Sequence, residues 1–102
     1  LGHPVACVAG RAVVSAVLNR GLLRRVQAQG VKLTAALHER FGQNPHVGDI
    51  RGRGLFQALE FVTDRETKTP FDPPVGVNKI VKKAAFKAGL ICYPMGTQLT
   101  VT

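Results

Sequence analysis

The stretch of residues 4–19 constrains the fold of this chain more than any other part of it. Pro4 suits the first turn of a helix, where its missing N–H costs nothing. From there on, polar side chains recur every fourth residue, at Arg11, Ser15 and Asn19. A helix with one narrow polar stripe is apolar around most of its circumference, and such helices belong in the interior of large proteins. The sequence therefore predicts a helix over residues 4–19 whose apolar surface a chain of 102 residues cannot fully cover.

The uncovered part of that helix predicts self-association. An exposed apolar patch on the order of a few hundred Å2 usually marks an interaction site. We therefore expect a homo-oligomer formed through residues 4–18, most simply a symmetric dimer. The length of the chain fits a single domain, residues 1–102.

A second helix is expected over residues 22–41. Its apolar residues recur with the spacing of one helical face, and Gly30 falls in the same row. Gly42 and then Pro45 end it. The apolar row consists of Leu22, Val26, Leu33, Leu37 and Phe41.

Beyond Pro45 the spacing of apolar residues changes from helical to alternating. Residues 47–51 predict a short strand, residues 52–54 a turn or bulge, and residues 55–62 a second strand. We expect the two strands to pair as an antiparallel ribbon. Glu60 shares a strand face with apolar side chains, and Arg51 or Arg53 across the ribbon would supply its partner.

A third helix and a last strand complete the expected fold. Three prolines within residues 70–74 make the segment 63–74 a loop. A helix over residues 77–88 is capped by Gly89, and a buried strand over residues 90–93 stops at Pro94. The core stripe predicted for this helix is Val77, Ile80, Val81, Ala84 and Ala88. The fold class is therefore α+β, with two N-terminal helices, a small antiparallel sheet and a third helix.

The chain is basic, with 14 Lys and Arg against 6 Asp and Glu and a formal net charge of +8. Such a charge is compatible with nucleic-acid binding. The charges are scattered, however, and only 6% of the residues are aromatic, so a solvated basic surface is the preferred interpretation and no specific nucleic-acid partner is expected.

Two cysteines do not make a disulfide framework, and both Cys7 and Cys92 sit in apolar runs. We expect buried free thiols and a reducing, cytoplasmic compartment. No apolar run approaches the roughly 20 residues of a membrane span, so no membrane partner is expected.

No motif within the chain predicts catalytic residues or a metal site. His3 and Cys7 lie four apart, on one helical face, but a metal needs more ligands and none lies nearby. The glycines of residues 48–54 match neither common phosphate-loop pattern, and a tight turn or bulge explains them as well. None of the six lysines has the desolvated setting that a Schiff base needs.

The order of these stretches resembles the class III aminotransferases. Gly2-His3-Pro4-Val5-Ala6-Cys7 opens an Ala/Val-rich helix, as in the GHPVACAAA-type segment of that family. Residues 47–56 resemble its VGDVRGxGLM signature and are continued by residues 60–62. Residues 21–26, 64–68 and 89–96 are similar to three further stretches, in the same order. The likeness runs from Gly2 to Gly96 and indicates the C-terminal segment of such an enzyme.

The resemblance implies a homodimeric fold-type-I enzyme that uses pyridoxal 5'-phosphate (PLP) to move an amino group between an amine or amino acid and a keto acid. It places the Schiff-base lysine, the acidic partner of the pyridine nitrogen and the phosphate turn before Leu1. It places the arginine for the substrate carboxylate after Thr102. Of this chain's residues, only Gly2 and His3 are expected near the cofactor. The 102 residues alone are expected to be inactive and to bind no PLP.

A second interpretation is a small basic module that binds nucleic acid or a protein. The apolar first helix favours the enzyme segment, because a self-contained module would not expose such a helix.

Overall fold

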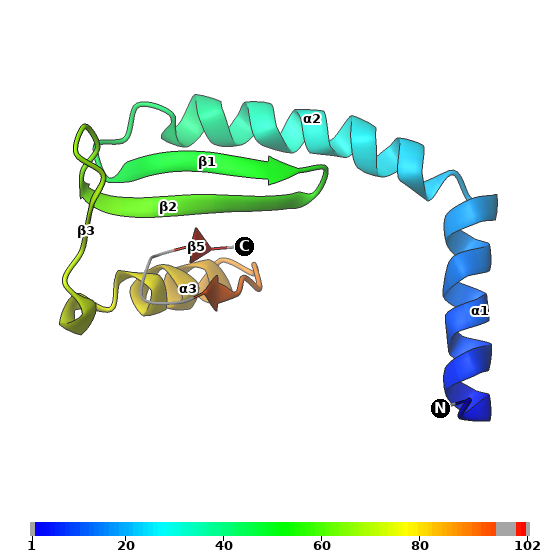
Figure 1. The fold of residues 1–102 in the computed structure, drawn as a ribbon. Helices are drawn as coiled ribbons and strands as arrows, with labels where there is room; N and C mark the ends of the chain where they lie inside the picture. The colour runs from blue at the N-terminus through cyan, green and yellow to red at the C-terminus, as the bar shows by residue number, and fades with distance from the viewer. Residues whose placement is uncertain (1, 96–99, 102) are drawn as a thin grey trace.

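The computed structural model describes residues 2–95 and 100–101. It shows one helix that projects as an arm from a body made of helices and a small sheet (Figure 1). The arm is α1 (Pro4–Asn19), and α2 (Leu22–Phe41) follows it along the body, both with the bounds that the sequence predicts. Gly21 joins them with φ +61°, in the left-handed region that favours glycine. The two helix axes differ by 69°, so α1 extends away from everything else (Figure 1).

The exposure of α1 exceeds what the sequence predicts. Within Pro4–Asn19, all of which the structure describes, no residue is buried. The helix meets α2 only near their junction (Figure 1), so most of its surface lies away from the rest of the chain. Cys7 is therefore exposed, and the expectation of a buried thiol is wrong there. Cys92 is buried, and both thiols are free.

The helix α2 packs one face against the sheet, as its spacing predicts. Gly30 is buried in the centre of this face. Val26 lies in the predicted row, where its side chain approaches Gly54, but it is 37% exposed because it lies towards the open end of the helix. The half-buried side chains of this face are Leu22, Leu33, Leu37 and Phe41.

Strands β1 (Val47–Arg53) and β2 (Phe56–Asp64) form the predicted antiparallel ribbon, with Ile50 opposite Leu59. A register shift between Val47 and Asp49 marks a bulge. The first strand is longer than predicted, because Gly52 and Arg53 still pair across the ribbon and the turn is confined to the next two residues. The buried apolar side chains centre on this ribbon and are Val47, Ala58, Val62 and Cys92.

Short strands extend the sheet. β3 (Thr69–Pro70) pairs with β2 inside the predicted loop, which also holds the 3-10 turn η1 (Pro73–Val75). β4 (Pro94–Met95) and β5 (Thr100–Val101) pair with each other, and β5 pairs with β2, so the sheet order is β1-β2-β5-β4. Gly96, which ends the family-like stretch 89–96, lies outside the described residues.

The strand predicted over residues 90–93 is wrong. This segment has no strand pairing, and Ile91 is 84% exposed. The Leu90 N–H instead donates to the Ala85 carbonyl, and the Gly89 N–H to that of Phe86, which together close the C-terminus of α3. The apolar run at residues 90–93 therefore begins as the C-terminal cap of α3, and strand pairing starts only at Pro94.

Helix α3 (Val77–Lys87) has the predicted position, but its packing face only partly matches the predicted stripe, since Val77 and Val81 alone of that stripe are half-buried. Gly89 follows it with φ +88°, which confirms the predicted glycine cap. Ile80 and the predicted core alanines, Ala84 and Ala88, are exposed. The side chains turned inward are Val77, Asn78, Val81 and Ala85. The helix is rotated because it packs against the short strands β4 and β5, which the sequence does not reveal.

Candidate functional site

The two residues expected near a cofactor lie at the free end of the arm. His3 is the N-cap of α1, and its carbonyl accepts a hydrogen bond from the Cys7 N–H at 3.0 Å. Its side chain makes no capping hydrogen bond. Gly2 has φ +81°, and a Cβ built on it would meet no described atom within 4 Å. Both residues are exposed, so this end of the chain is open to a ligand or to another segment.

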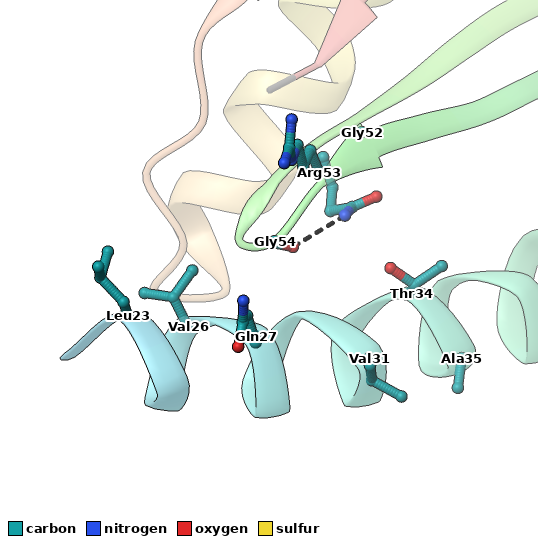
Figure 2. A pocket seen from close by; sticks show the side chains of 10 residues that line it. Leu23, Val26, Gln27, Val31, Thr34, Ala35, Gly52, Arg53 and Gly54 are labelled. Atoms are coloured by element: carbon teal, nitrogen blue, oxygen red, sulfur yellow. Dashed lines mark hydrogen bonds between the residues drawn. The ribbon is translucent and has the colours of Figure 1, made fainter. Parts of the chain in front are cut away.

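A groove of about 740 Å3 is lined by residues of α2 and of the β1–β2 turn (Figure 2). Apolar side chains of α2 line one side of it, and the glycine-rich turn forms the other. The Gln57 side-chain amide donates to the Gly54 carbonyl at 2.9 Å, which braces the turn (Figure 2). The lining residues are Leu23, Val26, Gln27, Val31, Thr34, Ala35, Gly52, Arg53, Gly54 and Gln57.

The sequence patterns do not predict this groove. The available signal was the placement of Leu23 and Val31 on α2, outside the apolar row that packs on the sheet. Large apolar residues off the packing face are easily taken for isolated surface residues. Only the crossing of α2 over the turn brings Leu23 and Val31 into one groove with Arg53 and Gln57.

The predicted partner of Glu60 is confirmed as Arg51. One guanidinium nitrogen of Arg51, Nη1, lies 2.5 Å from Glu60 Oε2 and 2.9 Å from Asp49 Oδ2. The three side chains share one face because positions 49 and 51 alternate and position 60 lies opposite on β2. The hydrogen bond from Arg51 is the main cause that lowers the pKa of Asp49, and the bond to Glu60 is the main cause that raises the pKa of Arg51.

This arrangement commits the two carboxylates to a structural role. A general acid or base needs a carboxyl group free to exchange its proton with a substrate. Asp49 and Glu60 are instead held by one arginine. Arg53 differs, because among the described residues no carboxylate lies within ion-pair distance of it.

The six lysines all lie at the surface of the structure. A Schiff-base lysine is made reactive by desolvation or by a neighbouring cation. All six side chains are exposed, and they are Lys32, Lys68, Lys79, Lys82, Lys83 and Lys87. The described part of the chain also holds no cluster of three or more His, Cys, Asp or Glu residues that could ligate a metal.

No single described helix is long and apolar enough to cross a membrane. Helices α1 and α2 together meet the length and composition criteria only as a pair bent by 69°.

Comparison with known proteins identifies the relatives of this fold. The class III aminotransferase family model matches residues 1–102. An aminotransferase from Gibberella zeae is 42% identical over 99 residues, which are 95% of this chain and 19% of that protein. An omega-aminotransferase from Paracoccus denitrificans superposes with a TM-score of 0.86 and 36% identity, over 98% of this chain and 22% of the other. A PLP-bound aminotransferase mutant from Vibrio fluvialis superposes with a TM-score of 0.86 and 33% identity, over the same shares of the two chains.

These likenesses define the fold class, which is that of the fold-type-I transaminases. The chain belongs to the class III aminotransferase family. It spans about a fifth of the length of the relatives it matches. The comparisons give no support to the alternative of a small basic binding module.

Proposed function

We propose that the chain is the C-terminal, small-domain segment of a PLP-dependent class III aminotransferase. The protein that contains it would move an amino group between an amine or amino acid and a keto acid. The observation that carries this proposal is the family match over residues 1–102. The match to only a fifth of each relative is compatible with a division of labour, in which other parts of the protein hold the catalytic residues.

The apolar arm supports the same proposal on physical grounds. Five large apolar residues of α1 are 57–70% exposed, and burial of a Val or Leu side chain is worth about 1.5–3 kcal/mol. In a longer enzyme this surface would pack on the large domain or near the dimer interface. In the 102-residue chain alone, we propose that it joins two copies through residues 4–18. The five residues are Val5, Val8, Val13, Val14 and Leu18.

PLP, when bound, supplies the electron sink for amino transfer. The described residues of this chain do not fit its anchoring, because every lysine is exposed to solvent. We propose that Gly2 and His3 approach the cofactor site from the open end of α1. Because Gly2 has no side chain, its backbone can approach a neighbouring group closely. Its positive φ lies in a region that glycine adopts readily.

We also propose a reducing, cytoplasmic location for the protein. The proposal is supported by two unpaired thiols, one of them exposed.

The proposal is tested by isolating the natural protein that contains this sequence and measuring its intact mass. Amino transfer from an amine or amino acid to a keto acid is then assayed with and without added PLP. We expect a mass several times the 10.9 kDa of this chain and PLP-dependent transfer. A natural product of 10.9 kDa without transfer activity would contradict the proposal.

A further inference from the structure

We propose that another segment of the same polypeptide, outside these 102 residues, covers the groove between α2 and the β1–β2 turn. This segment carries a carboxylate that pairs with Arg53. The inference rests on the proposed function, because it requires a longer protein. It goes beyond that function by assigning a partner to a surface with no place in the catalytic chemistry.

Exposed apolar side chains of α2 line the groove. Leu23 and Val31 are 61% and 72% exposed, and Val26 is 37% exposed. Such residues are ordinary on a surface when they are scattered, but a group that lines one hollow marks an interaction site (Figure 2).

The positive charge of Arg53 determines which chemical group the covering segment must carry. Among the described residues that line the groove, Arg53 is the one that carries a charge. Its neighbour Arg51 is paired with two carboxylates, whereas Arg53 is paired with none among residues 2–95 and 100–101. A segment that covers the groove removes water from the rim where Arg53 lies, and a desolvated guanidinium is costly unless an anion pairs with it. The segment therefore brings a carboxylate, which can bind the guanidinium through two hydrogen bonds.

A second copy of this chain is the less suitable occupant. Each copy carries a formal charge of +8, so a second copy brings few carboxylates that could pair with Arg53. The chain has six acidic residues, and two of them, Asp49 and Glu60, are held by Arg51. Asp64 is engaged as well, since it accepts backbone N–H groups from Glu66 and Thr67. About four fifths of each matched relative lies outside the part that this chain covers, which provides ample chain to supply the segment.

Two adjacent alanines of α2 provide a matched test of coverage in the natural, longer protein. Ala35 lines the groove, whereas Ala36 is exposed and does not line it. Each is replaced by cysteine, and the rate of maleimide labelling is followed on the peptide that contains it, so other thiols do not interfere. We expect labelling of Ala35→Cys to be at least ten times slower than that of Ala36→Cys. We also expect Arg53→Gln to raise the rate at position 35 several-fold. Equal rates at 35 and 36 would overturn the coverage, and an unchanged rate with Arg53→Gln would overturn the ion pair.

A zero-length cross-link identifies the occupant. The variant Arg53→Lys keeps the positive charge and supplies an amine that a carbodiimide condenses with a carboxylate in contact; the amide forms, and the carbodiimide takes up the oxygen as a urea. Mass spectrometry is expected to find residue 53 linked to one Asp or Glu of the same polypeptide, outside the 102 residues. No link, a link within the 102 residues or a link to another molecule would each contradict the proposal.

The amino-transfer assay on the same preparation separates the two proposals. If the enzyme transfers amino groups but positions 35 and 36 are labelled at equal rates, the covering segment is contradicted and the proposed function is not. A natural product of 10.9 kDa defeats the proposed function and, since it lacks the covering segment, this inference too.

Discussion

Gly30 in the middle of α2 meets Gly54 of the β1–β2 turn backbone to backbone. A Cβ built on Gly30 would lie 2.7 Å from the Cα, carbonyl carbon and carbonyl oxygen of Gly54. Gly54 has φ +60°, so it also needs the freedom of glycine to turn the chain. This contact sets how closely α2 approaches the ribbon and therefore where the groove opens.

The substitution Gly30→Ala is expected to destabilise the fold by about 1–3 kcal/mol, the usual cost of overpacking, because the obstructing atoms are backbone and cannot rotate away. Urea unfolding measures the change. The control is Gly10→Ala, where a Cβ meets nothing within 4 Å of the described structure. Helix propensity there predicts a gain of about 0.5–1 kcal/mol. A harmless Gly30→Ala would show that the contact does not determine the packing.

Arg51 gives Asp49 a pH-dependent contribution to stability. The pKa of Asp49 in the folded chain lies below its ordinary value of 3.8. This contribution is therefore fully present above pH 3.8 and is lost as the pH falls through the lower, folded pKa. In Arg51→Gln, an NMR titration of the Asp49 carboxyl carbon is expected to show its pKa rising towards 3.8, and the acid-induced loss of stability is expected to shrink.

The matched control for that titration is Arg24→Gln, which removes the same charge from an exposed position of α2. It should leave the pKa of Asp49 in place. Equal shifts in both variants would indicate that the general positive charge, rather than the hydrogen bond from Arg51, lowers this pKa.

The exposed arm predicts association of the 102-residue chain. Val13 is 63% exposed on α1, and a glutamate there would place a charge in any interface formed by residues 4–18. Sedimentation at micromolar concentration is expected to show a dimer for the parent and a monomer for Val13→Glu. A monomeric parent would mean that the arm stays uncovered in the isolated chain.

The exposure of all six lysines predicts that none forms a specific Schiff base with PLP. Addition of PLP and then borohydride to the 102-residue chain should give weak labelling spread over several lysines by peptide mass spectrometry. One stoichiometrically labelled lysine, accompanied by amino transfer, would contradict both this prediction and the assignment of the catalytic lysine to another part of the protein.

Local patterns in the sequence were sufficient for the helices and the main ribbon. The bounds of α1 and α2 follow from Pro4, Gly21 and Gly42, which begin, separate and end two helices. The ribbon follows from alternation on either side of the turn, and the same alternation places Arg51 beside Glu60. Each of these features depends on residues that are close in sequence or joined by one tight turn. The regular geometry of helix and strand is therefore enough to predict which of their side chains lie together.

Only the tertiary structure determined which surfaces of distant segments pack against one another. Ile80 and the run at residues 90–93 have the composition of a core. Ile80 is nevertheless exposed because α3 packs on the short strands β4 and β5, which periodicity does not reveal. Ile91 is exposed in a segment that caps α3 instead of pairing as a strand. Cys7 lies in an equally apolar run and is exposed because α1 bends away from the body. The groove exists only because α2 crosses the turn at Gly30 and Gly54. Hydrophobic burial is non-directional. The composition therefore indicates that apolar surface must be covered, but only the packing of the folded chain determines which apolar surfaces are covered.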